Sequence, residues 1–543
     1  MYDKTIVYQI RARRKNNSPA AAVLRLAEPA AGLLPSGGLW LYKAPGPCYN
    51  AEVRNARNCE KRRNLPVKAP FSAYLSGIKP GLQKLLGLLQ PDYDYVSILA
   101  TDSKGLTVRI SRHARSVGSE TMTTERGVVV RVSKNGQYSE YALNGFDPEK
   151  PQEAAREIRE AIDAQLALLA KAGVESYPTP PLPDEPCSLF VEKEAEQLPE
   201  ETDAKPLVEK LSALIDRMGE MSEELIECMA SAQSTHICKL FLTKNRDMSQ
   251  SYVYSEGSVA AVAMRDGRNQ IGYESVSGLG GPELFEDLEP AAEKAVKTAL
   301  ELLDAERIEP GEYEIIASPE VTGLIAHEAF GHGVEMDMFV KNRALGKEYI
   351  EKRVGSDLVT MHEGALCAEN VTSYAFDDEG TLAGDVIEID RGILKTGICD
   401  ALSALRLGIR PTGNGKRENF EHKAYTRMTN TIFDSGTDSL EDMIASIENG
   451  FLLEGMESGM EDPKHWGIQC IIKMGREIKH GKLTGRIVAP IIMTGYVPDL
   501  LGNISMLSPD RQVFGSGGCG KGYKEWVKVS DGGPYLKTKA RLG

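Results

Sequence analysis

The segment SPEVTGLIAHEAFGHGVEMD (Ser318–Asp337) decides how the second half of the chain is interpreted. It follows Tyr313–Ala317, a short run that reads as a strand. Ser318 is a favoured helix N-cap and Pro319 suits the first helical position, so a helix is predicted to begin here. We therefore interpret the segment as an apolar helix that follows a strand.

The predicted helix carries three residues with a clear chemical use, His327, Glu328 and His332. Neutral imidazoles bind zinc, and an adjacent carboxylate can take a proton from water on the metal. Zinc lowers the pKa of that water toward ~7, so hydroxide can attack a carbonyl near neutral pH. We predict that both histidines bind zinc and that Glu328 is the general base. The alternative is that His327 packs in the core while His332 caps a helix end.

The spacing of the two histidines has a structural consequence. His327 and His332 are five residues apart, which places them about 140° apart around a regular helix. A single π-turn would bring them together, and so would an end of the helix at Gly331. Gly331 and Gly333 make either distortion easy, because each glycine weakens a helix by ~1 kcal/mol relative to alanine. We predict a helical irregularity between Glu328 and Gly333.

Zinc needs at least a third protein ligand. Apart from thiolates, the candidates are five other histidines and the acids after the motif: His236, His362, His422, His465, His480, Glu335 and Asp337. Glu335 and Asp337 could instead be hydrogen-bond partners of the ligating histidines. Cys519 lies in the glycine-rich GSGGCGKG, next but one to Lys521, where a thiol can be exposed and deprotonated. A tight turn with an incidental cysteine is the alternative.

Hydrophobic periodicity in the first half predicts an α+β arrangement with an antiparallel sheet and long helices. An apolar pattern begins near Leu82. The predicted helices are Pro151–Lys171, Pro206–Met218 and Glu289–Leu303. The predicted strands are Gly127–Val132, Gln137–Leu143, Leu225–Thr243 and Ser251–Met264, with a strand–turn–strand over Val96–Ile110 that turns at Asp102–Gly105. The Asn135-Gly136 pair predicts a hairpin, and the proline-rich 173–186 a linker or surface loop.

The second half is richer in turn residues, which recur in DDEGT, DSGTD, ESGMEDP and SDGGP. Such punctuation is typical of antiparallel β structure. The overall fold class is therefore predicted as α+β, with residues 76–308 forming an N-terminal α+β domain. Residues 309–543 would form a mostly antiparallel β domain that carries the metal-site helix. Residues 1–75 would be a poorly ordered or lineage-specific extension.

Composition narrows the class of protein. The 543 residues carry a net charge of −14, which argues against a general nucleic-acid binder. Met1–Pro70 is nevertheless basic, with 13 Lys/Arg against 4 Asp/Glu. The nine cysteines form no C-x-x-C pair, which suits a reducing compartment. Neither a signal peptide nor a run of ~18 apolar residues is recognisable, so we expect a cytoplasmic protein that does not span a membrane.

Several separated motifs, in order from about Asp92 onward, resemble the TldD/PmbA family. The clearest are LIAHEAFGHGVEMD (Leu324–Asp337), RPTGNGKRENFEHKAYTRMTN (Arg410–Asn430) and GSGGCGKGYKEWVKVSDGGPYL (Gly515–Leu536). The chain looks most similar to the catalytic TldD-type members. Met1 to about Lys68 has no recognisable counterpart, and Gly459–Lys473 departs from the family pattern, which puts the usual substrate preference in doubt.

The resemblance implies a zinc metalloprotease of the H-E-x-x-x-H type. Its metal ligands would be His327, His332 and Cys519, with one Zn²⁺ per site and Glu328 as catalytic base. The implied substrate is an unfolded or flexible peptide, including leader segments of modified peptides. The implied partner is a PmbA/TldE-type paralogous subunit, or a second copy of the chain in a dimer.

Two other classes of function are weighed against this one. A non-catalytic peptide-binding subunit of a TldD/PmbA-type complex would have no need of the complete motif. A small-molecule amidase or deformylase would favour H-E-x-x-H with an upstream cysteine. Here Cys519 lies almost 190 residues downstream of His332.

Overall fold

The computed structural model describes residues 67–171, 179–521 and 525–543, which all belong to one compact unit. Residues 1–66 and part of the proline-rich stretch lie outside the described residues, and so does most of the predicted extension. Ordered structure begins earlier than the predicted residue 76, because β1 (Val67–Lys68) pairs with β7 (Glu194–Ala195). The division into two domains stays a prediction.

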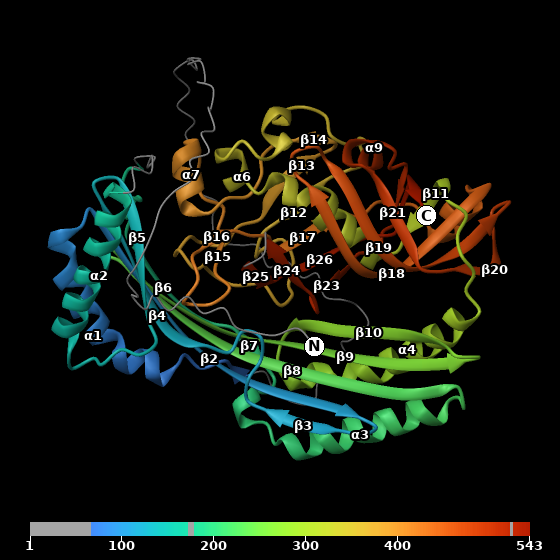
Figure 1. Ribbon diagram of the computed structural model, residues 1–543, viewed down its shortest axis with the longest axis horizontal. Coiled ribbons are helices and arrows are strands. Elements are labelled where there is room, and N and C mark those ends of the chain that lie inside the picture. The colour runs from blue at the N-terminus through green and yellow to red at the C-terminus, as the bar shows by residue number, and fades with distance from the viewer. Residues whose placement is uncertain (1–66, 172–178, 522–524) are drawn as a thin grey trace, which may run out of the picture. The chain divides into compact units, whose positions relative to one another are not determined.

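An eight-stranded sheet dominates the first half (Figure 1). Along the sheet its main strands are β10 (Arg268–Leu279), β9 (Arg246–Arg265), β8 (Leu225–Leu242), β2 (Tyr95–Ser111), β4 (Arg126–Lys134) and β5 (Gln137–Leu143). The short β3 (Arg115–Gly118) pairs with β2, and β6 (Cys187–Glu192) pairs with β9 in the one parallel contact of this sheet within the described residues. The predicted hairpin is confirmed, since Asn135 and Gly136 join β4 to β5 with φ of 54° and 76°.

The predicted turn at Asp102–Gly105 is wrong. These residues lie inside the continuous strand β2, where Asp102 pairs with Arg126 on one side and Cys238 on the other. The buried Asp102 carboxylate accepts hydrogen bonds from Ser72 Oγ at 2.5 Å and Arg126 Nε at 2.7 Å. A residue typical of turns is thus stabilised within a strand by partners distant in sequence.

Strand β10 was not predicted. A turn at Asp266 and Gly267, with φ of 52° and 77°, joins it to β9. The Asp-Gly dipeptide is a strong hairpin signal, so the sequence did hold the information.

Four long helices cover one face of this sheet (Figure 1). They are α1 (Ala73–Leu89), α2 (Pro151–Lys171), α3 (Ala204–Glu220) and α4 (Leu288–Leu303). The three predicted helices correspond to α2, α3 and α4. Helix α1 begins after Ser72, whose side chain accepts from the Leu75 N–H, and it buries the leucines of the apolar pattern near Leu82. No helix in the described residues is long and apolar enough to cross a membrane.

In the second half, five strands pair in a closed ring. In ring order they are β11 (Gly311–Ala317), β18 (Asn449–Asp462), β19 (Gly467–Lys479), β21 (Ile491–Tyr496) and β27 (Leu536–Leu542). Strand β27 pairs back to β11, and the short β20 (Lys482–Val488) and β22 (Met506–Leu507) extend the ring. Only the β11–β18 contact of the ring is parallel, which agrees with the mostly antiparallel prediction.

A second sheet has six strands, which lie between β11 and β27 in the chain, and it shares a hydrophobic core with the ring. Its order is β14 (Ile393–Leu394), β13 (Val386–Asp390), β12 (Met361–Glu363), β17 (Asn430–Phe433), β26 (Ser530–Gly533) and β23 (Gln512–Phe514). Two small two-stranded sheets complete this half: β15 (Gly415–Lys416) with β16 (Tyr425–Thr426), and β24 (Gly518–Lys521) with β25 (Glu525–Lys528). Its helices are short: α5 (Pro319–Leu324), α6 (Asp337–Val340), α7 (Ala401–Leu407), α8 (Leu440–Ala445) and α9 (Val497–Gly502). The fold class is α+β, as predicted.

The uncovered face of the first-half sheet packs against loops of the second half. Tyr252 and Tyr254 of β9 form a buried cluster with Val371 and Tyr374. Between the halves, Arg417 also donates to Glu140 at 2.7 and 2.9 Å. The eight-stranded sheet therefore supports second-half loops that contain Val371, Tyr374 and Arg417.

Candidate metal centre

The helix that begins at Pro319 changes its winding where the histidines lie. Ser318 caps it, as predicted, and α5 ends at Leu324. Residues Ile325–Gly331 form a π-helix, followed by a 3₁₀ turn at His332–Val334. The His332 N–H donates to the His327 carbonyl, five residues earlier. The predicted irregularity is confirmed, and this wide turn brings the two imidazoles onto one side.

The structure brings His327 and His332 together with Cys519. Their ligand atoms all lie within 4.8 Å of one another, and Cys519 Sγ is 3.3 Å from His332 Nε2. The two imidazole rings stand nearly perpendicular, with centroids 5.1 Å apart. Two imidazole nitrogens and one thiolate are a donor set that fits zinc. Among residues 67–171, 179–521 and 525–543, this is the one group of three such side chains with the spacing of a metal site.

Cys519 reaches this site from strand β24, and it is buried rather than exposed as its glycine-rich context suggested. Burial alone would raise the pKa of its thiol, but the neighbouring His332 and His327 hold that pKa well below the ordinary value. In return, burial would lower the pKa of His327, while the Cys519 thiolate raises it to about 9. The thiolate and the imidazoles therefore stabilise each other's charged forms, and a cation that binds here competes with protons.

Glu328 lies beside the three donors. Its side chain is 14% exposed, and its Oε2 is 4.0 Å from His332 Nε2. Strand β18 passes directly over it at Gly459, where a Cβ would stand 2.5 Å from Glu328 Cγ. A side chain larger than hydrogen at Gly459 would therefore displace the predicted base.

The segment 459–473, which departs from the family pattern, is packed against the metal-site helix. Buried Trp466 contacts Phe330 of the π-helix, with ring centroids 5.8 Å apart. A Cβ at Gly333 would stand 2.6 Å from Glu461 Oε1. The unusual residues thus border the site itself.

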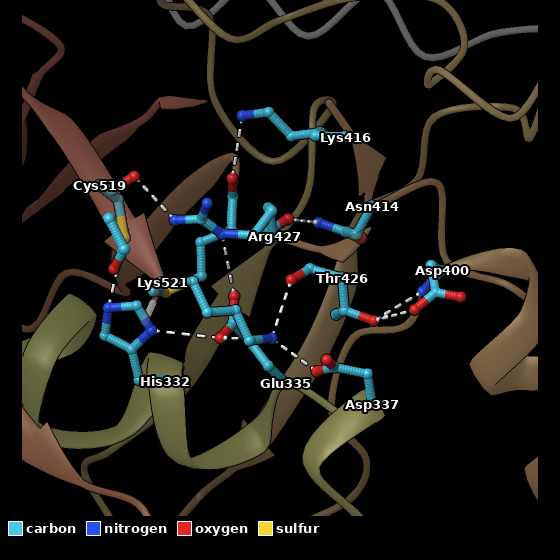
Figure 2. A network of polar contacts seen from close by, with 12 residues as sticks. His332, Glu335, Asp337, Asp400, Asn414, Lys416, Thr426, Arg427, Cys519 and Lys521 are labelled. Carbon is cyan, nitrogen blue, oxygen red and sulfur yellow. Dashed lines mark hydrogen bonds and ion pairs between the residues drawn. The ribbon is translucent and has the colours of Figure 1, made fainter. Parts of the chain in front are cut away.

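A buried polar network surrounds the second histidine (Figure 2). His332 Nδ1 donates to Glu335 Oε2 at 3.2 Å, which leaves Nε2 toward Cys519. Asp337 does not reach either histidine by a hydrogen bond but pairs with Lys521 Nζ at 2.6 Å. Of the two acids considered as partners of the ligands, Glu335 has that contact. Lys521 and Arg427 also join the network, and no spacing pattern in the sequence singled them out together.

His327 has a different environment. Its Nδ1 is buried and has no hydrogen-bond partner among the described residues. The buried Asp531 of β26 packs against the helix at Gly323, about one turn before His327. Its Oδ1 lies 2.5 Å from the position that a Gly323 Cβ would take. Burial raises the pKa of Asp531 to about 7, although the nearby His327 opposes that rise. Asp531 is thus a neighbour of the site that the sequence interpretation missed.

The other candidate histidines lie elsewhere, each beside an acid. Their partners are Glu200 for His236, Asp385 and Asp434 for His362, Glu418 for His422, Asp462 for His465, and Glu448 for His480. None of them belongs to the group of three donors.

Comparisons with known proteins agree with this architecture. A model of the PmbA/TldA metallopeptidase C-terminal domain matches residues 310–539, which include the three donors and Glu328. A metalloprotease of Synechocystis sp. is 27% identical over 472 residues, which cover 86% of this chain and 98% of the relative. A zinc metalloprotease TldD homolog of Saccharolobus solfataricus is 32% identical, over 42% of this chain and 51% of the relative.

A solved structure extends the similarity beyond the C-terminal half. TldE from Thermococcus kodakarensis superposes with a TM-score of 0.67 over 85% of this chain and 100% of its own, at 18% identity. At that identity the likeness concerns the fold. Together with the matched C-terminal model and the named relatives, these findings show that the chain belongs to the PmbA/TldD family.

Proposed function

We propose that the chain is a zinc-dependent peptidase of the TldD type that hydrolyses peptide bonds of unfolded or flexible peptides. The observation that supports this proposal is the convergence of His327, His332 and Cys519 beside Glu328. Three protein donors around a catalytic zinc leave one position for water or substrate. The names of the metalloprotease relatives point in the same direction.

The residues of the site divide the chemistry between them. When bound, zinc supplies a Lewis acid that polarises the substrate carbonyl and acidifies water. Glu328 takes the proton of the attacking water and passes it to the leaving amine. His332 is held in one tautomer by Glu335, which keeps its Nε2 unprotonated and free to bind the metal. The packing of β18 over Glu328 restricts the carboxylate to the side of the donors.

The proposal includes the assembly that the family resemblance implies. A PmbA/TldE-type subunit, or a second copy of this chain, would be the partner, and leader segments of modified peptides are among the proposed substrates. The likeness of the fold to TldE supports a relationship with such subunits. The segment 459–473 borders the site, so we expect substrate preference to differ from that of relatives with another sequence there.

Peptide hydrolysis by wild type and Glu328→Ala tests the proposal. Assays with an unfolded protein substrate, alone and with a PmbA-type partner, should show activity for wild type. Removal of the general base should lower kcat about 10²–10⁴-fold while zinc stays bound. An exposed carboxylate far from the site, Glu441, provides the matched control, since Glu441→Ala should retain full activity. Full activity of Glu328→Ala would contradict the mechanism.

The runner-up is a non-catalytic peptide-binding subunit. Metal content distinguishes this subunit from the proposed enzyme, because a binding subunit requires no zinc. Fewer than ~0.2 zinc ions per purified chain, with no activity after zinc is added, would favour the binding subunit over the enzyme.

A further inference from the structure

The three predicted ligands come from two separate pieces of the chain. His327 and His332 lie on one helix, whereas Cys519 lies 187 residues after His332, on strand β24. Strand β24 pairs with β25 in a two-stranded sheet whose backbone pairs with no other strand of the described chain. The chain continues from β25 into β26 of the six-stranded sheet, and side-chain contacts further hold β24, and with it the thiolate, relative to the histidines.

One carboxylate contacts both pieces (Figure 2). Glu335 is 1% exposed and directly follows the 3₁₀ turn that contains His332. Its Oε2 accepts from His332 Nδ1 at 3.2 Å and lies 3.1 Å from Lys521 Nζ. Lys521 is in the same strand as Cys519, two residues further on. The same oxygen thus contacts one ligand directly and the strand of another through a lysine.

The second oxygen of Glu335 leads to Cys519 by another route. Its Oε1 lies 3.6 Å from Nε of Arg427, which is fully buried. Arg427 also donates to the Cys519 carbonyl at 2.8 Å. Cys519 is therefore held through its own backbone and through Lys521, and both connections end on Glu335.

The charges of this network favour an ionised carboxylate at its centre. Lys521 further binds Asp337 Oδ1 at 2.6 Å and donates to the Thr426 carbonyl at 3.2 Å, so its ammonium group is well satisfied despite burial. Burial alone would raise the pKa of Glu335, but Lys521 and the contact with His332 hold it well below the usual range. Removal of any partner leaves a buried charge uncompensated, which is costly in a protein interior.

We propose that Glu335 is a positioning residue that couples the two halves of the metal site. It orients His332 so that Nε2 faces the metal, and through Lys521 and Arg427 it holds the β24–β25 sheet where Cys519 can bind. This inference rests on the proposed metal site and adds that the thiolate ligand depends on an ion-pair network. The alternative is an ion cluster that stabilises the fold without acting on the ligands.

Metal binding by Lys521→Met distinguishes the two possibilities. Lys521 touches no proposed ligand, so a loss of affinity would act through Glu335 or through the position of Cys519. Zinc affinity, measured by competition with a chelator, should fall about 10–100-fold, as for other partners of metal ligands. In the cobalt(II)-substituted protein, the thiolate-to-cobalt charge-transfer band should weaken more than the ligand-field bands, since the thiolate is displaced first. Lys521→Arg should restore part of the band.

Lys528→Met is the matched control. Lys528 is a buried lysine on the other strand of the same two-stranded sheet, and its Nζ pairs with Glu256 at 2.6 Å, outside the network. The Lys528→Met variant should be less stable than wild type, but its thiolate-to-cobalt charge-transfer band should not weaken selectively. Wild-type zinc affinity and cobalt spectrum in Lys521→Met, or equal changes in both lysine variants, would overturn the proposal.

Glu335→Gln provides the second test, in which the amide oxygen can still accept from His332 but the charge is lost. It should also weaken zinc about 10-fold or more and lower kcat more than it raises KM. Thermal unfolding of the metal-free variants checks that they fold, and if Glu335→Gln does not, Lys521→Met decides. Because the cobalt spectrum is independent of turnover, a wild type that shows the thiolate band but no peptidase activity would end the proposed function and leave this inference standing.

Discussion

Among the described residues, a histidine lies between a cysteine and a glutamate in two places. In the first half, His236 Nε2 lies 3.5 Å from Cys238 Sγ and His236 Nδ1 lies 2.9 Å from Glu200. In the second half, His332 makes the equivalent contacts with Cys519 at 3.3 Å and with Glu335 at 3.2 Å. We call these the His236 set and the His332 set. By residue type and distance they are nearly the same.

Their thiols nevertheless differ in the direction of the pKa shift. Burial raises the pKa of Cys238 to about 12, with further rises from the acids Asp102 and Glu200. The pKa of Cys519 is instead held well below its usual value by two imidazoles. The second imidazole, His327, is present only because the helix is wound as a π-turn. We therefore propose that the second histidine is what enables a Cys–His–Glu contact to hold a metal, whereas the His236 set is a buried hydrogen-bonded group.

The largest expected difference between the two sets is in zinc binding. Cys519→Ser should weaken zinc about 100-fold or more, because a neutral hydroxyl replaces a thiolate ligand. Cys238→Ser should change zinc affinity less than about 2-fold, since the donor atoms of the His236 set do not converge on one point as those of a metal site do. Chelator competition on both purified variants measures the contrast. Equal losses in the two variants would show that the sets do not differ as argued.

A smaller effect is expected from the turn that supplies the second histidine. A Cβ at Gly331 would stand 2.3 Å from Met428 Sδ and 3.3 Å from the Ala326 carbonyl. Gly331→Ala should therefore shift the π-turn or the methionine, destabilise the protein by about 1–3 kcal/mol and weaken zinc about 10-fold. The exposed Gly467, with no atom near its missing side chain, provides the control variant Gly467→Ala. A gain in zinc affinity by Gly331→Ala would mean that the turn is not what aligns the histidines.

Local sequence patterns predicted the helical irregularity at the histidines and most of the longer helices and strands of the first half. The five-residue spacing of His327 and His332 required an irregular helix if both were to bind one metal, and the glycines permitted it. Helix α2 matches its predicted bounds, since its amphipathic pattern alone decides where it lies. These features depend on residues close together in the chain.

Features that depend on partners distant in the chain could not be predicted from local sequence patterns. The turn expected at Asp102 failed because Ser72 and Arg126 satisfy its carboxylate within a strand. Cys519 was expected on an exposed loop, but β24 places it in a buried cluster with Val527 and Met428. The contact of Lys521 with Glu335 joins residues 186 positions apart, and neither local sequence indicates that the two residues meet.

The smallest effect concerns the His236 set as a source of stability rather than of metal binding. Burial would raise the pKa of Glu200, but the hydrogen bond and charge of His236 lower it to about 2. A carboxyl whose pKa is lowered on folding stabilises the protein above its unfolded pKa, and that contribution is lost as pH falls toward the folded pKa. Glu200→Gln should therefore destabilise the protein by about 1–2 kcal/mol at pH 7, after allowance for partial exposure.

The difference between wild type and Glu200→Gln should shrink as pH falls from about 5 toward 3.5. Urea unfolding of both proteins across this range measures it, and the exposed Glu149 supplies a control, since Glu149→Gln should show no such trend. A difference that does not change with pH would mean that Glu200 acts through packing. A loss of zinc in Glu200→Gln would be more serious, because the carboxylate of the His236 set would then act on the metal, and the contrast with Glu335 would disappear.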